Sequence, residues 1–406
     1  MAGDTALRQN GGAADGAPAA ALPALWLGRV MLTDFRSYAR VELAPDARPV
    51  VLTGPNGAGK TNLLEAISFL APGRGLRRAK LAEVERRVPA EAAGRTSWAV
   101  AASVATAQET RELGTGRDPA LDAAEGNGRE RRLVRIDGAP ARSQQELGEI
   151  LGMVWLTPQM DGLFREGAAA RRRFLDRLVY GFDPAHAGRV SAYEQALRER
   201  ARLLKAGRAE PAWIAALEDG MARHGVAIAA ARRALVARLG QACAAGVGAF
   251  PVAGLALSGE VEDWLAGEAA LAAEDRLRAR LAERRAGDAE SGGAAIGPHR
   301  SDLLVRHLDR GQAAELCSTG EQKALLISIV LAHARLIGLH RGAAPLLLLD
   351  EVAAHLDAVR RRALYDEILA LGVQAWMTGT DAETFAPLGE AVQSYRVLDS
   401  TLRPAA

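Results

Sequence analysis

The 406-residue chain is poor in cysteine and in long apolar runs. Its two cysteines, Cys243 and Cys317, lie far apart and lack metal-ligand spacing, which argues against a disulfide framework and a zinc site. Apolar stretches such as 324–332 are much shorter than the roughly 20 residues that cross a bilayer. Residues 1–24 lack the basic segment and apolar core of a secretory signal. We therefore expect a cytoplasmic protein without a membrane span, preceded by a disordered tail, 1–24.

An excess of charge of one sign is also missing. The chain has 51 lysines and arginines and 49 aspartates and glutamates, which neither requires nor excludes a nucleic-acid partner. Because aromatic residues make up 4% of the chain, backbone contact with DNA is favoured over base stacking. Three basic clusters are candidates for phosphate contacts, although each could be an ordinary solvated helix face: Arg77, Arg78 and Lys80; Arg171 to Arg173 with Arg177; and Arg360 to Arg362.

The order of apolar segments predicts an α/β fold with a mixed sheet and an inserted, mainly helical lobe. Between about 168 and 285 the apolar residues follow the helical period, with a short return to strand near 255–261. The polar, glycine-containing segment 108–130 predicts an exposed loop, and a glycine-containing linker is expected after about residue 286. We expect strands at 26–35, 39–43, 48–53, 97–106, 131–137, 153–157, 302–307, 345–349 and 373–378, and late helices at 319–340 and 358–371.

The segment Gly54-Pro55-Asn56-Gly57-Ala58-Gly59-Lys60-Thr61 matches the phosphate-binding pattern G-x-x-x-x-G-K-[ST] at every fixed position. It lies between a predicted strand and a predicted helix, as this motif requires. The glycines let backbone N–H groups surround phosphates at the helix N-terminus. We expect all eight residues to bind ATP, with Lys60 also catalytic and Thr61 a ligand of Mg²⁺. The alternative is a plain glycine turn before a helix.

Four leucines followed by Asp350 and Glu351 form a second candidate element. A buried strand that ends in two acids suits a Walker B motif, in which Asp350 would hold Mg²⁺ and Glu351 would orient or deprotonate the attacking water. Paired carboxylates also occur at an ordinary helix N-terminus. The phosphate loop in the same chain favours the catalytic interpretation.

The segment Cys317-Ser318-Thr319-Gly320-Glu321-Gln322-Lys323 begins a long predicted helix shortly before the acidic strand. Taken alone, it could be a simple helix cap. Its position relative to the other two elements resembles that of the ABC-type ATPase superfamily. There, such a signature contacts the γ-phosphate of a nucleotide held by the opposite subunit. The resemblance implies nucleotide contacts for Ser318, Gly320, Glu321 and Gln322.

Shorter motifs extend this resemblance. Gln159 resembles the Q-loop glutamine, which implies a catalytic role and a place in the Mg²⁺ shell. His355-Leu356-Asp357 resembles the D-loop, which implies a nucleotide contact for Asp357. In 378–381, a threonine or an aspartate stands where a transporter ATPase carries its switch histidine.

The compact spacing of these motifs is similar to that of the RecF family of bacterial recombination mediators. Further matching motifs are Phe35-Arg36-Ser37-Tyr38, Glu166-Gly167 with the arginines that follow, and Gly297-Pro298-His299-Arg300-Ser301-Asp302. The similarity implies an ATP-dependent homodimer that binds single-stranded, gapped or junction DNA, with RecO and RecR as partners. It also implies roles in recombinational repair, replication restart and the SOS response. Whether the chain is an effective enzyme stays open, and we expect a weak DNA-dependent ATPase activity that serves as a switch.

On this interpretation the tail is followed by the N-terminal part of a P-loop ABC-type ATPase head (25–165), a helical lobe (166–290) and the C-terminal part of the head (291–406). Two alternatives remain open. One is another ABC-type ATPase, SMC-like or transporter-like, without a DNA-repair role. The other is a binding module with a degenerate site.

Overall fold

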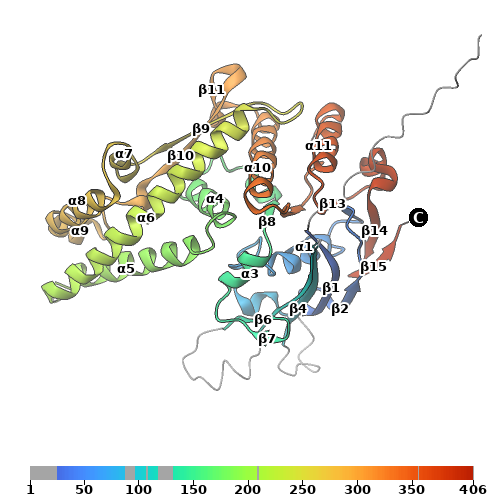
Figure 1. Cartoon of the computed structure of the whole chain (residues 1–406), viewed down its shortest axis with the longest axis horizontal. Coiled ribbons are helices and arrows are strands. Elements are labelled where there is room, and N and C mark those ends of the chain that lie inside the picture. Colours follow the sequence, from blue (N-terminus) through green and yellow to red (C-terminus); the bar gives the residue numbers. More distant parts are fainter. Residues whose placement is uncertain are drawn as a thin grey trace, which may run out of the picture.

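The computed structural model describes residues 25–86, 97–106, 108–117, 131–207, 210–354 and 356–405, so the predicted tail lies outside the described residues. Figure 1 shows a mixed α/β head that holds both ends of the described chain, and a mainly helical lobe formed by the middle of it. This arrangement confirms the predicted α/β class with an inserted helical lobe.

The central sheet of the head combines strands that are far apart in the sequence, in the order β15-β14-β3-β13-β12-β8. All pairings among β14, β3, β13, β12 and β8 are parallel. In β12, Leu346 and Leu348 face one hydrophobic core while Leu347 and Leu349 face the other, because the sheet is covered on both faces. The strands are β3 (Val50–Thr53), β8 (Met153–Leu156), β12 (Leu346–Leu349), β13 (Ala375–Gly379), β14 (Gln393–Leu398) and β15 (Thr401–Pro404).

A second, antiparallel sheet of the head corrects one prediction. Thr110–Gly116, expected within a loop, forms strand β5, while residues 118–130 of that loop lie outside the described part. Gly116 reads as a loop residue, but a Cβ there would lie 2.5 Å from the Trp98 carbonyl oxygen, so glycine permits close strand approach. The sheet has the order β2-β1-β4-β5-β6-β7, with β1 (Leu25–Phe35), β2 (Tyr38–Leu43), β4 (Ala99–Thr106), β6 (Leu133–Ile136) and β7 (Ala139–Pro140).

The lobe contains a small sheet of its own, in the order β11-β10-β9. The linker expected after residue 286 is instead helical at first, because Arg285–Ser291 forms α9. The predicted boundary between the lobe and the C-terminal part of the head, at residues 290 and 291, stays a prediction. Strand β10, which follows this boundary, pairs with the lobe strand β9 and with β11. The elements are α4 (Ala168–Tyr180), α5 (His186–Ala206), α6 (Pro211–Ala244), β9 (Ala253–Ser258), α7 (Glu260–Gly267), α8 (Ala270–Glu283), β10 (Asp302–His307) and β11 (Gln312–Ala313).

The long helix α10 (Thr319–Arg341) joins the head to the lobe. It packs against β8 and α11 of the head and against α6 and β9 of the lobe. By length and composition it could cross a membrane, yet 72% of its most apolar window is buried inside the protein, as in the core helix of a globular fold. The other helices of the head are α1 (Lys60–Ser68), α3 (Gln145–Ile150) and α11 (Ala358–Leu371).

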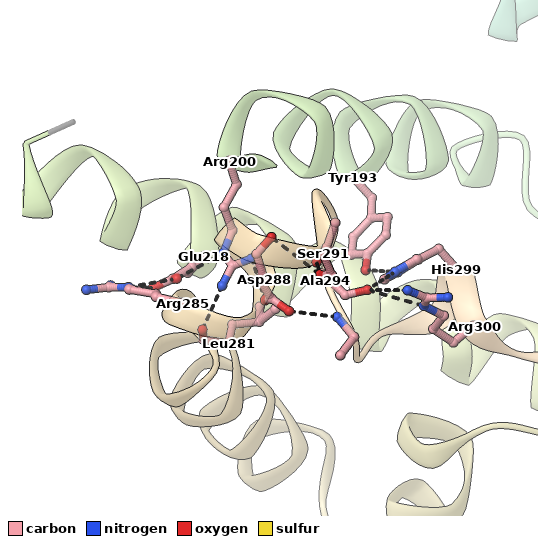
Figure 2. Close-up of polar contacts among 12 residues, drawn as sticks. Tyr193, Arg200, Glu218, Leu281, Arg285, Asp288, Ser291, Ala294, His299 and Arg300 are labelled. Carbon is pink, nitrogen blue, oxygen red and sulfur yellow. Dashed lines mark hydrogen bonds and ion pairs between the residues drawn. The ribbon is translucent and has the colours of Figure 1, made fainter. Parts of the chain in front are cut away.

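A buried ion network holds the far end of the lobe together (Figure 2). The Arg200 guanidinium of α5 is 1% exposed and donates hydrogen bonds to Glu218 of α6 (3.0 Å) and Asp288 of α9 (2.8 Å). It also donates to the Leu281 carbonyl of α8 (2.7 Å), and Arg285 pairs with Glu218 from the other side. One guanidinium therefore joins four helices.

His299, from the Gly297–Asp302 motif, has a structural role beside this network. Its Nδ1 accepts a hydrogen bond from the Tyr193 hydroxyl (2.7 Å), and its Nε2–H donates to the Ala294 carbonyl (2.9 Å) (Figure 2). The acceptor role of Nδ1 requires a neutral ring, and burial lowers the pKa of His299 in agreement with it, although the bond to Ala294 opposes that shift. The motif thus ties α5 to the chain that enters β10.

Candidate nucleotide-binding site

Four parallel strands of the central sheet end at one edge. The register pairs Thr53 with Gly379, Met377 with Leu349 and Leu349 with Leu156, so the segments that follow β3, β13, β12 and β8 all leave this edge. The phosphate loop, Asp350 with Glu351, and the Gln159 segment are thereby brought together. The first two do not follow neighbouring strands, because β13 lies between β3 and β12.

The phosphate loop depends on glycine at two positions. Gly54 has φ +150°, and a Cβ there would collide with the Val397 carbonyl of β14. Gly59 has φ +111°, and a Cβ there would lie 2.9 Å from the Tyr38 hydroxyl. Both conformation and space therefore exclude a side chain. Residues 55–57 form the exposed tip of the loop, where backbone N–H groups can meet phosphates.

The Phe35–Tyr38 motif supports this loop from behind. The Tyr38 hydroxyl donates to the Gly59 carbonyl (3.0 Å), and the Asn62 amide donates to the Ser37 hydroxyl (2.9 Å). The Arg36 guanidinium donates to both carboxylate oxygens of Glu65, a fully buried residue of α1 (2.8 and 2.9 Å). The motif therefore fixes the loop and the start of α1. This supporting role could not be inferred from the resemblance alone.

Lys60 is buried within its own loop at 5% exposure. Its ammonium group donates to the carbonyls of Gly54 (2.6 Å) and Pro55 (2.9 Å). Burial lowers the pKa of Lys60, and the nearby charges of Glu351 and Asp350 oppose that shift. The ammonium is thus held at the loop that would receive phosphates.

Asp350 connects the phosphate loop to β13. Its Oδ1 accepts hydrogen bonds from the Thr61 hydroxyl (2.9 Å) and the Thr378 hydroxyl (2.8 Å). Thr378 in turn accepts from the backbone N–H of Glu351 (2.8 Å), a residue held at φ +50°. Thr378 had been considered only as a replacement for the switch histidine. This bond depends on the order of the strands in the sheet. The position of Thr378 in the sequence therefore did not predict it.

The donor set at Thr61 and Asp350 fits Mg²⁺. Magnesium in nucleotide sites takes few protein ligands, usually one or two oxygen donors, and completes its shell with phosphates and water. Asp350 is 6% exposed and its Oδ1 lies 2.9 Å from the Thr61 hydroxyl, so one ion could bind both. No cluster of three or more His, Cys, Asp or Glu side chains able to hold a metal occurs among the described residues.

Thr378→Val is expected to destabilise the protein by about 1–3 kcal/mol, because valine leaves the partly buried Glu351 N–H without its acceptor and the buried Asp350 carboxylate without one donor. Chemical denaturation measures the loss. Thr380→Val, at an exposed position of the same segment, is the matched control and should change stability far less. Equal effects of the two substitutions would contradict the role given to Thr378.

The signature segment is a fully formed capping box at the start of α10. Ser318 caps the helix by accepting from the Glu321 N–H, and the Glu321 carboxylate accepts from the Ser318 N–H (2.9 Å). Gln322 is 1% exposed and donates to the Cys317 carbonyl (2.8 Å), whereas Ser318 is exposed. Across the described residues, no hydrogen bond or ion pair joins 318–322 to 54–61.

Lys323, to which the sequence assigned no role, links the signature helix to the other motifs. Its ammonium group donates to the Ala354 carbonyl (2.9 Å) and lies 3.5 Å from the Glu351 carbonyl and from the Asp161 carboxylate. Asp161 directly follows the segment that contains Gln159. One buried lysine therefore contacts the acidic motif and the Q-loop at once.

Two predicted site residues, Gln159 and Asp357, are not bonded to Thr61 or Asp350 in the described structure. Gln159 lies in a short 3-10 turn (Pro158–Met160) and is exposed, and no hydrogen bond within the described structure joins its side chain to Thr61 or Asp350. Asp357 caps α11 by accepting from the Arg360 N–H (2.8 Å). His355 lies outside the described residues.

The basic clusters differ in how much charge they leave free. Arg171 pairs with Asp302 (2.7 Å), and the half-buried Arg177 lies over the Trp155 ring, where desolvation lowers its pKa to about 10. Two arginines of the second cluster therefore help to hold α4 in place, whereas Arg173 is exposed. Arg77 of the first cluster pairs with Glu65. Arg360 and Arg362 of the third pair with Asp357 and Asp366.

Comparison with known proteins finds a matching family model and similar curated proteins over most of the chain. The family model described as "RecF/RecN/SMC N terminal domain" matches residues 26–399. A curated protein of Rhizobium rhizogenes (strain K84), named DNA replication and repair protein RecF, is 49% identical over 375 residues, which are 92% of this chain and 97% of the relative. A protein of the same name from Rhizobium meliloti (strain 1021) is 50% identical over 371 residues, covering 91% and 96% of the two chains.

Solved structures agree on the fold. One described as the recombination mediator protein RecF-ATPrS in the RecFOR pathway has a TM-score of 0.80 at 20% identity, covering 96% of this chain and 100% of the solved chain. An Smc head domain from Pyrococcus furiosus, bound to the C-terminal domain of ScpA, has a TM-score of 0.52 at 15% identity, covering 94% of this chain and 96% of that chain. At these identities the similarity shows a common ATPase-head fold.

Proposed function

Since the chain belongs to the RecF family of DNA replication and repair proteins, we propose that it acts in DNA repair as an ATP-dependent dimer that closes on DNA. The observation that carries this proposal is the contact between the Thr61 hydroxyl and Asp350 Oδ1, which joins the phosphate loop to the acidic motif across most of the chain. The solved relatives described with ATP or ATPrS support nucleotide binding.

Each part of the site has a defined task in this proposal. The N–H groups of 56–61 and the Lys60 ammonium bind the phosphates of ATP, for which Lys60 exchanges its carbonyl partners for phosphate oxygens. Thr61 and Asp350, with Gln159 in the outer shell, would hold Mg²⁺, which neutralises phosphate charge when bound. Glu351 orients the attacking water and accepts its proton.

A second copy of the chain completes the site. The exposed Ser318, at the N-terminus of a 23-residue helix, is suited to a γ-phosphate but has no contact with the phosphate loop of its own chain within the described residues. Ser318, Gly320, Glu321 and Gln322 would therefore cap the nucleotide bound by the partner, with Asp357 nearby. ATP then stabilises the dimer and its slow hydrolysis releases it.

The cellular role follows from the family. We propose that the dimer binds single-stranded, gapped or junction DNA in the cytoplasm and cooperates with RecO and RecR in recombinational repair, replication restart and the SOS response. The phrase "RecFOR pathway" in the description of the solved relatives supports this context. A transporter-like ATPase would instead be coupled to a membrane partner and would not bind DNA.

Lys60→Met tests the nucleotide site. Loss of a charge-assisted contact of about 1.5–3 kcal/mol should weaken ATP binding roughly 10- to 100-fold. Sedimentation velocity of the wild type with gapped DNA and ATP should show dimers that are absent without nucleotide, and Lys60→Met should abolish them. Lys205→Met, at the exposed end of α5, is the matched control and should dimerise normally. Dimers that form equally well without nucleotide would refute the proposed ATP-dependent closure.

A further inference from the structure

A cleft of about 1000 Å³ separates the head from helix α5 of the lobe. The segment after α1 and the start of α3 line it on the head side, and the first turns of α5 line it on the other. In Figure 1 this is the region where α3 faces α5. No residue of the candidate nucleotide site lines the cleft.

The charged residues that line this cleft have one sign, although the Glu83 and Glu146 carboxylates accept from the backbone of two lining residues. Its described lining includes Arg74, Lys80 and Arg132 but no carboxylate and no aromatic ring. Arg74 and Lys80 are exposed, and neither forms an ion pair with a described residue. Arg77, between them in sequence, is paired with Glu65 and does not line the cleft. The lining therefore presents positive charge without an internal counter-ion.

Arg132 adds a buried charge to the wall. Its side chain is 7% exposed and has no carboxylate partner among the described residues. Its guanidinium donates instead to the carbonyls of Gly73 (2.7 Å) and Ala71 (3.2 Å) and to Gln144 (3.2 Å). Burial lowers the pKa of Arg132 to about 9, so it stays charged at neutral pH. Arg132 therefore holds the segment that carries Arg74 by hydrogen bonds to its backbone. It also leaves a net positive charge beside the cleft.

The α5 wall is small and polar. Ala187, Gly188 and Ala192 carry little or no side chain, and Gln145 of α3 lies against Gly188, while Ser191 and Gln195 offer a hydroxyl and an amide. Such neutral groups commonly contact phosphate and sugar oxygens in protein–DNA interfaces. Without an aromatic ring the lining cannot stack bases, so contact would be made with the backbone and would be independent of sequence.

We infer that this cleft binds the phosphodiester backbone of a DNA strand. The inference rests on the proposed DNA-binding function and assigns part of it to specific residues: Arg74 and Lys80 contact phosphates, Ser191 and Gln195 contact the backbone from α5, and Arg132 is a positioning residue. Because the strand spans head and lobe, its binding is sensitive to their relative position.

The first experiment removes the two exposed charges. Fluorescence anisotropy of a labelled oligo-dT and of a duplex of equal length, titrated with salt in the presence of ATP, compares the wild type with Arg74→Ala/Lys80→Ala. Loss of two phosphate contacts should weaken single-strand binding about tenfold and reduce the slope of log K against log[salt] by about 1.4. The control, Arg198→Ala/Arg202→Ala, removes the same charge from exposed residues of α5 that are paired with glutamates, and should change neither quantity.

A second pair of variants reverses the sign at one exposed position of α5. Ser191→Lys should strengthen DNA binding and Ser191→Glu should weaken it, each by several-fold, without altering ATP binding measured in the absence of DNA. Equal effects of the two substitutions, or normal DNA binding by Arg74→Ala/Lys80→Ala, would overturn the inference. The inference would also be overturned if Arg74→Ala/Lys80→Ala bound a poly-glutamate peptide more weakly than the wild type does but bound DNA equally well. Wild-type protein that binds no DNA at low salt would instead refute the proposed function.

Discussion

A Glu351→Gln variant is expected to retain ATP binding and dimerisation while hydrolysis falls by roughly 10²- to 10⁴-fold, the usual contribution of a general base. Glutamine keeps the size of the side chain but cannot accept the proton of the attacking water. The closed dimer should therefore accumulate on DNA. Lys60→Met is expected to do the opposite, because it prevents the dimer from forming.

The backbone around Glu351 explains why this change should stay local. The Glu351 N–H donates to Thr378, and the Lys323 ammonium lies 3.5 Å from the Glu351 carbonyl oxygen. Both contacts involve main-chain atoms, which the substitution leaves in place. The effect should therefore appear in hydrolysis and not in stability.

Single-turnover phosphate release, together with sedimentation in ATP and gapped DNA, checks this prediction. Glu383→Gln makes the same chemical change at an exposed residue following β13 and should hydrolyse ATP at the wild-type rate. A Glu351→Gln variant that hydrolyses ATP within threefold of the wild type would assign the proton acceptor to another residue.

An Arg200→Met variant is expected to lose about 3–5 kcal/mol of stability, the usual effect of removing one member of a buried ion network. Glu218 would keep Arg285, but Asp288 would lose its ion partner while staying 2% exposed. The Leu281 carbonyl would also lose its donor. The loss should be largest in the lobe, where the four helices meet (Figure 2).

Urea denaturation followed by circular dichroism measures this effect, and hydrogen exchange locates it. Arg202→Met, two residues along α5 and paired with Glu199 in solvent, should change stability by less than about 0.5 kcal/mol. A loss below about 1 kcal/mol for Arg200→Met would mean that packing, not the network, holds α5 to α8 and α9.

The elements with strong local signals were predicted closely. Helix α11 was expected at 358–371 and spans Ala358–Leu371, because Asp357 caps its start and Gly372, at φ +60°, ends it. The four leucines of β12 indicated a strand buried on both faces. The phosphate loop was recognisable because its glycines, Lys60 and Thr61 occupy fixed positions in a short segment.

Features that depend on long-range pairing were not predictable in this way. Strand β14 has one buried residue, Val397, and no clear alternation, so its pairing with β3 had no sequence signature. The role of Thr378 depends on β13 lying between β3 and β12, and neither segment indicates that order. The arginines of α4 looked like a surface cluster because their partners, such as Asp302, lie more than a hundred residues away.

The place of β3 in the central sheet has a consequence for biosynthesis. Both neighbours of β3, β13 and β14, are formed by residues 375–398, near the end of the chain. The antiparallel sheet and the lobe are formed by residues that lie closer together in the sequence. They therefore emerge from the ribosome well before β3 can pair. Until translation is nearly complete, the phosphate loop has the support of the Phe35–Tyr38 motif but not of the central sheet. We therefore expect a nascent or prematurely terminated chain to bind ATP more weakly than the finished chain.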